Sequence, residues 1–254
     1  MNFQKRKQAI LAALESAGEA DIKALAVELK VAEITIRRDL NVLAEDGLLY
    51  RTHGGAMKVS DVAPTFGNKA AVHIAAKEAI CRRAAALVND GDILFMDCGS
   101  TVFHLCPFIR NKKVQVITNS IPVVYALQGS RVALNIIGGE FDMERQAVHG
   151  KMAEQHIRQY RATMAFLGVD GISSQGLFAN SEKEAAMSLS LAAQSKRSCL
   201  LCDASKVGRE TYLHFSGLEL IDTVVTDAVA ADCRFLKKAG IRVLSVSDQP
   251  RGRG

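Results

Sequence analysis

Short apolar runs alternate with helical segments through residues 76–254, and this alternation constrains the fold more than any other feature of the sequence. The apolar runs lie at 93–96, 114–118, 132–137, 164–168, 198–202, 223–226 and 241–245. Helical segments are expected at 76–88, 102–109, 121–127, 153–160, 184–194 and 229–239. Short strands separated by helices form a mainly parallel sheet that is covered on both faces. Residues 76–254 therefore predict one large α/β domain.

Polar residues follow the first of these runs directly, in the order Asp97-Cys98-Gly99-Ser100-Thr101. The carboxyl ends of parallel strands meet at one edge of a sheet, and small ligands bind there. Gly99 allows a ligand to approach the backbone closely, while Ser100 and Thr101 offer hydroxyl and amide groups to an anion at a helix start. Asp97 can accept hydrogen bonds from sugar hydroxyls. These four residues are candidate ligand contacts.

Later runs end in similar residues, namely Thr118-Asn119-Ser120, Gly138-Gly139-Glu140, the segment 203–208 and Thr226-Asp227. Any one of these turns taken alone favours a structural role, because strand-to-helix turns use Gly, Ser, Asp and Asn. Five such turns at one edge of one sheet favour a ligand site. Lys206 is the best single candidate for a phosphate contact, because its side chain is a compact cation on a flexible stem.

A second pattern, in residues 1–58, predicts a small DNA-binding domain. Helices are expected at 3–16, at 22–29 with Asp21 as the N-cap, and at 33–44 after a bend at 30–32. Two short helices joined by a tight turn form a helix-turn-helix. Residues 48–51 and 56–58 are expected to be strands on either side of a turn at 53–55, which makes a hairpin wing.

The third helix carries the candidate DNA contacts. Its apolar residues Ile36, Leu40 and Leu43 recur at helical spacing, and a polar set lies mostly on the other face. That set is Thr35, Arg37, Arg38 and Asn41, and the wing adds Arg51, His53 and Lys58. Forked guanidinium donors suit guanine or phosphate, and an amide suits adenine. An ordinary surface helix is the alternative, and we expect Asp39 to pair with a nearby arginine rather than to read a base.

Composition limits these interpretations only loosely. The 254 residues are 48% hydrophobic and 23% charged, with a formal net charge of +5, so the chain can fill a core and tolerates a polyanionic partner. Residues 1–58 hold nine Lys and Arg against eight Asp and Glu, so the DNA argument rests on where the charges lie. Residues 59–75, with Pro64, show no helix or strand period and are expected to connect domains 1–58 and 76–254.

The six cysteines are expected to be reduced, buried thiols of a cytoplasmic protein, because they lie mainly in apolar surroundings and no signal peptide is evident. Cys199 and Cys202 fall within one expected strand and point to opposite faces, so a metal or redox role is not expected. The longest uncharged run, 114–130, is interrupted by polar residues and Pro122, so no membrane span is expected. No cofactor, metal or catalytic residue is indicated.

The N-terminal residues resemble the DeoR family of bacterial transcriptional regulators. The resemblance rests on Thr35-Ile36-Arg37-Arg38-Asp39-Leu40, Leu43, Gly47, Arg51 and His53-Gly54-Gly55-Ala56. The added wing motif makes the match specific, whereas a helix-turn-helix pattern alone is common. Ala32 stands where the family usually has serine, which removes one cap at a cost of roughly 1 kcal/mol.

The remainder of the chain resembles the sensor domain of the same family. The matching residues are Asp97, Gly99-Ser100-Thr101, Thr118-Asn119, Gly138-Gly139, Gly150, Glu184, Asp203, Ser205-Lys206, Gly208 and Thr226-Asp227. The resemblance implies a fold related to sugar-phosphate isomerases and CoA transferases, with a phosphorylated sugar as effector. It implies a pocket lined by Asp97, Gly99, Ser100, Thr101, Asn119, Gly138, Gly139, Glu184 and Lys206. Ser188 stands where many relatives carry a cation.

The sequence thus predicts a regulator that represses a carbohydrate-catabolism operon, binds double-stranded operator DNA as a dimer or tetramer, and responds to a phosphorylated sugar. The alternative is a sugar-phosphate isomerase-like enzyme with an appended nucleic-acid-binding domain, in which Asp97 or Glu184 is the general base. A DNA-binding domain has no purpose in such an enzyme. No histidine lies among the strand-end residues as an obvious general acid. A nucleic-acid module with a purely structural second domain is a third, weaker hypothesis.

Overall fold

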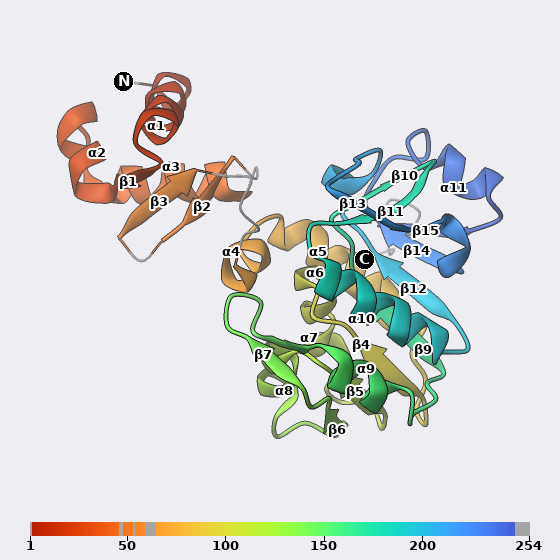
Figure 1. Cartoon of the computed structure of the whole chain (residues 1–254). Helices are drawn as coiled ribbons and strands as arrows, with labels where there is room; N and C mark the ends of the chain where they lie inside the picture. Colours follow the sequence, from red (N-terminus) through yellow and green to blue (C-terminus); the bar gives the residue numbers. More distant parts are fainter. Residues whose placement is uncertain (1, 46–47, 53, 59–64, 247–254) are drawn as a thin grey trace, which may run out of the picture. The chain divides into compact units, whose positions relative to one another are not determined.

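The structure, a computed structural model, describes residues 2–45, 48–52, 54–58 and 65–246. The chain forms two compact units, Met1–Ile74 and Ala75–Gly254 (Figure 1). Each unit buries its own apolar side chains. Gly47, His53 and residues 59–64 of the expected connector lie outside the described residues.

The N-terminal unit contains four helices and three strands in its described part. The helices are α1 (Phe3–Ala17), α2 (Ile22–Leu29), α3 (Glu33–Glu45) and α4 (Phe66–Ala70), and the strands are β1 (Glu19–Asp21), β2 (Leu49–Arg51) and β3 (Gly55–Lys58). The Asp21 carboxylate caps α2 by accepting hydrogen bonds from the amides of Lys23 and Ala24. The chain leaves α2 at Lys30, whose φ of 51° ends the helix. The helix-turn-helix and the β2–β3 wing are therefore present.

The strand β1 was not predicted from the sequence, because its three residues show no apolar alternation. It pairs antiparallel with β3, so the wing is a three-stranded sheet in the order β1-β3-β2. Gly55 is needed at this pairing, since a Cβ atom there would lie 2.0 Å from the carbonyl oxygen of Ala20. The close approach of these two backbones explains the glycine at the base of the wing.

The core of the N-terminal unit confirms the predicted apolar face of α3. Ile36, Leu40 and Leu43 are fully buried, against Leu14 of α1 and Leu25 of α2 among others. An ion pair ties α1 to α3, because both nitrogens of the Arg6 fork donate to the Asp39 carboxylate at 2.5 and 2.9 Å. This pair confirms that Asp39 serves an arginine of the same domain and faces away from the exposed side of α3.

The larger unit is built on a seven-stranded sheet whose neighbouring strands all pair in parallel. The strands are β4 (Ile93–Met96), β5 (Gln115–Thr118), β6 (Ala133–Ile136), β9 (Met164–Leu167), β12 (Ser198–Leu201), β14 (Thr223–Thr226) and β15 (Arg242–Ser245). Their order is β15-β14-β12-β9-β4-β5-β6. All seven apolar runs of the sequence are strands of this one sheet, which confirms the predicted α/β fold.

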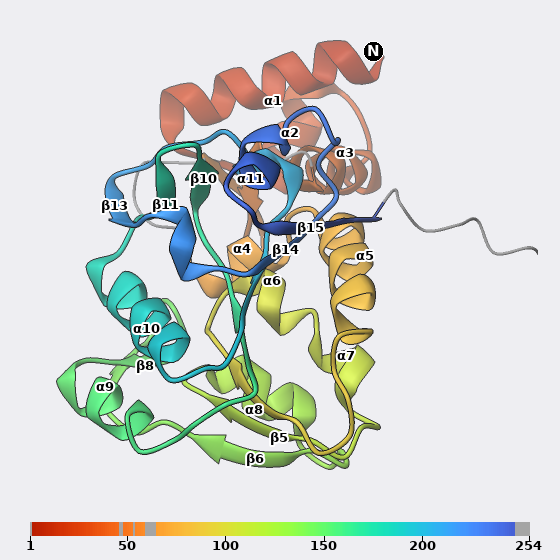
Figure 2. The same cartoon turned by 90° about the vertical axis from the view of Figure 1, so that its right-hand side faces the viewer.

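Helices cover both faces of the sheet (Figures 1 and 2). One face packs on α5 (Ile74–Ala85), α6 (Ser100–Phe103), α7 (Cys106–Ile109) and α8 (Ile121–Leu127), and the other on α9 (Lys151–Ile157), α10 (Glu182–Ala193) and α11 (Arg234–Lys238). Side chains alternate along each strand between the two cores. In β4, Phe95 belongs to the core under α10, while Leu94 and Met96 belong to the core under α5.

Two predicted helices differ in the structure. The expected helix at 102–109 is divided into α6 and α7, with Pro107 in the first turn of α7, because proline lacks the amide that a continuous helix requires. The expected helix at 229–239 is helical only over α11. The sequence also did not predict the hairpin of β7 (Glu140–Asp142) and β8 (Ala147–His149), nor the antiparallel sheet of β10 (Gly171–Ser173), β11 (Gly176–Ala179) and β13 (Leu213–Ser216).

All six cysteines are free thiols. Cys199 packs in the core on one face of the sheet and Cys202 in the core on the other, as the strand spacing predicted. Burial raises the pKa of both thiols well above the ordinary value.

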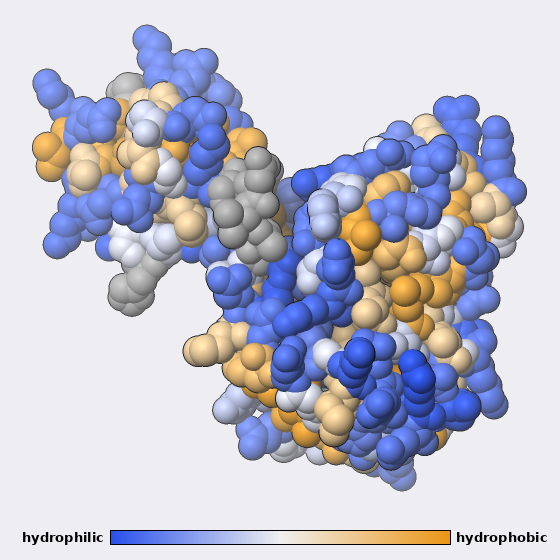
Figure 3. All heavy atoms as spheres, viewed as in Figure 1, coloured by the Kyte–Doolittle hydropathy of each residue, from blue (hydrophilic) through white to orange (hydrophobic). Residues whose placement is uncertain are grey.

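No helix in the described part of the chain is both long enough and apolar enough to cross a bilayer. The faces shown in Figure 3 are largely hydrophilic, with apolar side chains in separate areas.

Truncation of the α3 core should destabilise the N-terminal unit. Leu40 is fully buried, so Leu40→Ala should lower the free energy of unfolding of this unit by about 2 to 5 kcal/mol, measured by urea denaturation. Val42, on the exposed side of the same helix, is the control: Val42→Ala should change stability by about 0.5 kcal/mol or less. Equal effects of the two substitutions would contradict the assignment of the buried face.

Candidate functional site

The strand order places a switch point between β4 and β9, in the middle of the sheet. From β4 the chain continues to β5 and β6 on one side, whereas β9, β12, β14 and β15 lie on the other. The helices that follow β4 cover one face, and α10, which follows β9, covers the opposite face. In open parallel sheets, a crevice forms outside the carboxyl ends of the strands at such a point. The end of β4 is therefore the expected position of a ligand site.

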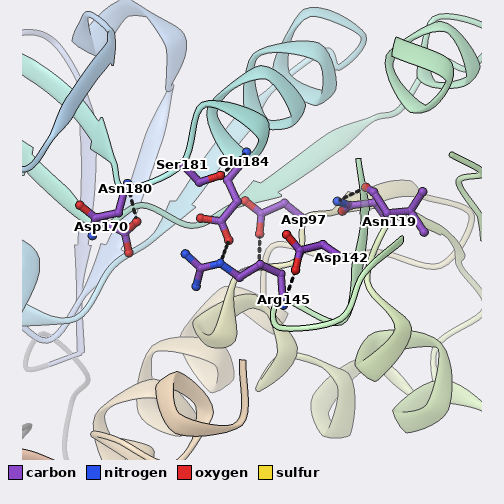
Figure 4. Close-up of polar contacts among 10 residues, drawn as sticks. Asp97, Asn119, Asp142, Arg145, Asp170, Asn180, Ser181 and Glu184 are labelled. Atoms are coloured by element: carbon purple, nitrogen blue, oxygen red, sulfur yellow. Dashed lines mark hydrogen bonds and ion pairs between the residues drawn. The ribbon is translucent and has the colours of Figure 1, made fainter. Parts of the chain in front are cut away.

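Asp97 lies at this switch point and joins the ends of β4 and β9 (Figure 4). Its carboxylate accepts hydrogen bonds from the amide of Gly99 at 2.5 Å and from the amide of Gly168 at 2.8 Å. The Ser188 hydroxyl on α10 lies 3.5 Å from the same carboxylate. Only 5% of Asp97 is exposed, and this burial raises its pKa to about 6, although the two amides act in the opposite direction.

The segment after Asp97 packs closely against the end of β9. A Cβ atom on Gly99 would lie 2.8 Å from an Asp97 oxygen and 3.3 Å from the Gly168 Cα atom, so glycine is required for packing. Ser100 and Thr101 are buried in the short helix α6. The ammonium group of Lys77, a buried residue of α5, donates to the Ser100 hydroxyl at 3.3 Å. A cation that the sequence did not single out thus lies beside this segment.

Asn119 follows β5, the neighbour of β4, and is fully buried. Its side-chain amide donates to the carbonyl of Val148 at 3.0 Å, and the Val148 amide donates to the Asn119 carbonyl at 2.8 Å. The Thr118 hydroxyl donates to the Met96 carbonyl at 2.6 Å, which joins the ends of β5 and β4. The two bonds between Asn119 and Val148 dock the β7–β8 hairpin onto the end of β5.

Glu184 lies in the first turn of α10 and faces the same hairpin. Its carboxylate pairs with the Arg145 guanidinium at 3.1 Å, and both side chains are largely buried. Figure 4 shows Arg145 reaching from the hairpin toward Glu184. Lys183 pairs with Glu140 of β7 in a second, exposed ion pair at 3.2 Å. In the larger unit, Arg145 therefore places a cation at Glu184, although Ser188 is uncharged.

The other predicted pocket residues lie at different distances from Asp97. Lys206 is half-buried, donates to the Val169 carbonyl at 2.7 Å, and is near enough to act electrostatically on Asp97. Gly138 and Gly139 instead line a neighbouring groove of about 720 Å³ against α9. The Gly138 amide donates to His156 there, at 3.2 Å. The structure thus gathers Asp97, Asn119, Glu184 and Lys206 around the switch point and places the two glycines beside it.

Sequence reasoning missed three residues of this region: Lys77, Arg145 and His149. Lys77 lies in the apolar stripe of α5 with Ile80, Cys81 and Ala84. A lysine at an apolar position of the helical pattern could have indicated a buried cation. Arg145 lies in the turn, and His149 at the end of the second strand, of the unpredicted β7–β8 hairpin. Nothing in the sequence indicated that this hairpin packs against the strand ends.

The exposed side of α3 forms the candidate DNA interface. Arg37, Arg38 and Asn41 are exposed and Thr35 is half-buried. Arg37 pairs with Glu33 one turn earlier at 3.5 Å, a weak and exposed ion pair. The helix begins without a side-chain cap from Ala32, whose carbonyl accepts from the amides of Thr35 and Ile36. An acidic residue in the first turn, Glu33, favours this end of the helix.

The candidate contacts of the wing are partly engaged within the N-terminal unit. The Arg51 guanidinium donates to the Gly55 carbonyl at 2.5 Å and so supports the turn. Burial lowers the pKa of Arg51, and the charge of Arg37 acts in the same direction. Lys58 pairs with Glu15 of α1 at 2.8 Å. His53 lies outside the described residues.

Two family models match the chain. A DeoR-like helix-turn-helix domain matches residues 6–62, and a DeoR C-terminal sensor domain matches residues 72–228. The lactose phosphotransferase system repressor of Lactococcus lactis subsp. lactis is 33% identical over 234 residues, which cover 89% of this chain and 92% of that protein. The HTH-type transcriptional repressor GlcR of Bacillus subtilis strain 168 is 28% identical over 258 residues, which cover 100% of both.

Similarity to solved structures is weaker. Ribose 5-phosphate isomerase from Plasmodium falciparum is 18% identical and covers 51% of this chain and 51% of that chain, with a TM-score of 0.38. This similarity is too low to support an inference about function. The two relatives named above are transcriptional repressors, and the L-fucose operon activator of Haemophilus influenzae, 29% identical over 91% of this chain and 94% of that protein, is a regulator of the opposite sign.

The raised pKa of Asp97 predicts a pH dependence of stability. The folded protein binds this proton more tightly than the unfolded chain, since the pKa rises from 3.8 to about 6. Asp97 therefore contributes most to stability at low pH, and this contribution is lost as the pH rises through 6. The free energy of unfolding of the wild type, relative to Asp97→Asn, should fall by about 2 kcal/mol between pH 4 and 7. Denaturation curves that keep a constant separation across this range would refute the shift.

Proposed function

The chain belongs to the DeoR family of transcriptional regulators, and we propose that it represses a carbohydrate-catabolism operon under the control of a phosphorylated sugar. In this proposal residues 1–58 bind operator DNA, residues 59–75 connect, and residues 76–254 sense the effector. The observation that carries the proposal is the buried cluster of charged and polar groups around Asp97 in a chain whose α3 exposes two arginines.

The DNA-binding role rests on the two faces of α3. Its apolar face and Asp39 hold the helix in the core, and the opposite face is left to Arg37, Arg38 and Asn41. No carboxylate among the described residues pairs with Arg38, so its full donor fork is available to a base edge or phosphate. Thr35 lies in the first turn, where backbone amides and a hydroxyl can contact phosphate. Arg51, Lys58 and His53 are assigned to phosphate contacts from the wing.

The effector role rests on the chemistry assembled at the switch point. Asp97, Asn119 and Glu184 supply oxygen acceptors for sugar hydroxyls. Lys77 and Lys206 are cations on either side of Asp97, one at Ser100 and one at Val169, and cations suit a phosphate group. Carboxylates and cations close together match a ligand that carries both hydroxyls and a phosphate. We assign Gly99, Ser100, Thr101, Gly138 and Gly139 to the walls of the same site.

The effector regulates DNA binding only if it binds two forms of the protein with different affinities. The candidate site is closed in this structure, because Asp97, Ser100, Thr101 and Asn119 are all at least 95% buried. A ligand must therefore bind a form in which the surrounding segments have moved. We propose a homo-oligomer. In that form the DNA-binding domains of two subunits no longer have the spacing of the two operator half-sites.

The names of the relatives support this assignment over an enzyme. A repressor of a lactose phosphotransferase system and a second transcriptional repressor match the chain almost from end to end. The Asp97 carboxylate holds two backbone amides, and we assign the lone pairs that these bonds leave to sugar hydroxyls rather than to a proton transfer. The carboxylate therefore has a binding and structural role in the proposed sensor.

Removal of the Arg38 fork should weaken operator binding without unfolding the protein. Arg38→Ala should raise the Kd for operator DNA by about 10- to 100-fold, with the melting temperature unchanged, because one bidentate contact contributes about 1 to 3 kcal/mol. Gel-shift titrations at several salt concentrations measure both the affinity and the number of phosphate contacts. The control is Arg242→Ala, an exposed arginine on β15. Equal affinities for the two variants would remove Arg38 from the interface.

Removal of the Lys206 ammonium should weaken the response to the effector and leave DNA binding intact. In a gel-shift assay, the concentration of sugar phosphate that releases half of the DNA should rise by about tenfold for Lys206→Ala, since a charge-assisted contact is lost. The control is Lys196→Ala, an exposed lysine before β12. An unchanged release curve for Lys206→Ala would exclude Lys206 from the effector site.

A further inference from the structure

His149, at the end of β8, is a buried polar side chain with no role so far. Only 1% of the residue is exposed, and neither ring nitrogen has a hydrogen-bond partner within the described part of the protein. Polar atoms that are buried without partners are rare in folded proteins, and each costs stability. If this side chain only filled space, an apolar residue could take its position with no loss of stability. The two unpartnered nitrogens therefore indicate a further role.

The surroundings of His149 place it in the sensor site. Glu184 and Arg145, which form the buried ion pair, both act electrostatically on its ring, as do Asp142 and Lys183. Its neighbour Val148 packs into the apolar core, and successive side chains on a strand point to opposite faces. The ring of His149 therefore points away from that core.

The imidazole of His149 is neutral at pH 7. Burial lowers its pKa, and the charges of Lys183 and Arg145 act in the same direction, against the opposing charges of Glu184 and Asp142. A neutral imidazole presents one donor and one acceptor. A sugar hydroxyl is itself one donor with acceptor lone pairs, so the two groups match. A phosphate group offers acceptors almost exclusively and matches only half of the ring.

A further unpartnered atom lies on Asn119, which follows β5 and is hydrogen-bonded to the residue before His149. Asn119 is fully buried, its amide nitrogen donates to the Val148 carbonyl, and its side-chain oxygen has no partner among the described residues. The bond to Val148 fixes the orientation of the Asn119 side chain next to the strand that carries His149. The sensor site thus holds an imidazole and an amide oxygen that both have no partner among the described residues.

We propose that His149, together with the side-chain oxygen of Asn119, binds hydroxyl groups of the sugar part of the effector and determines which sugar phosphate the protein accepts. This inference rests on the proposed function and deepens it. Lys77 and Lys206 bind the phosphate end, while the uncharged pair reads the hydroxyl pattern. Arg145 is a positioning residue, because its ion pair with Glu184 holds the β7–β8 hairpin over the site.

The test compares His149→Val and His149→Asn with the wild type in the full-length protein. Isothermal titration calorimetry with glucose 6-phosphate, fructose 6-phosphate, galactose 6-phosphate and ribose 5-phosphate identifies the sugar phosphate that the wild type binds most tightly. His149→Val should raise the Kd for that ligand by about tenfold and reduce the differences among the four, because neutral hydrogen bonds are lost. His149→Asn retains a donor and an acceptor and should fall between the two. His214→Val, in the separate sheet of β13, is the control and should bind as the wild type does.

Melting temperatures without ligand provide the second measurement. His149→Val removes two unpartnered polar atoms, so the variant should melt at or above the temperature of the wild type while binding ligand more weakly. A variant that melts below the wild type would show that the ring has a structural partner, such as an ordered water, and would overturn the inference. A Kd within twofold of the wild type would also overturn it, with the proposed function left standing. Failure of the wild type to bind any of the four ligands would count against the proposed effector class, and the inference would fall with it.

Discussion

The carboxylate of Asp97 joins the ends of β4 and β9 at the switch point of the sheet. β4 and β9 pair up to their ends, and the segments that follow them pass to helices on opposite faces of the sheet, so the Asp97 carboxylate links the two segments where they separate. Two backbone amides converge on one buried carboxylate, and this geometry brings Gly99 and Gly168 into contact. The cost of burying the charge is visible in the raised pKa. The remaining groups of the candidate site are arranged around this contact.

In the N-terminal unit the buried carboxylate is held by an ion pair rather than by backbone amides. Asp39 lies on the recognition helix, where a carboxylate would repel the phosphates of DNA if it faced outward. Its pairing with Arg6 turns the charge inward and ties α1 to α3. The arginines on the opposite face thereby keep their charge uncompensated, apart from the weak pair between Arg37 and Glu33.

The sequence predicted the parallel sheet well because buried parallel strands are continuous apolar runs, and each of the seven runs carries this signal. The strands that were missed, such as β1 and β7, have only three residues each, too few to show an apolar alternation, and β1 also depends on a partner, β3, that is distant in sequence. The strand-end rule located Asp97 and Asn119, whose ligand contacts stay predictions. It could not locate Arg145 or His149, because their place near Glu184 depends on how the hairpin docks. Pro107 was visible in the sequence and marked the break between α6 and α7.

The two-sided character of α3 has an evolutionary consequence. The side chains that fold this helix into its domain and those proposed to read DNA share no positions, since Ile36, Leu40 and Leu43 face the core while Arg38 and Asn41 face outward. Substitutions on the outer face can accumulate after gene duplication without loss of folding. Paralogues can in this way acquire new target sequences and still inherit an unaltered scaffold.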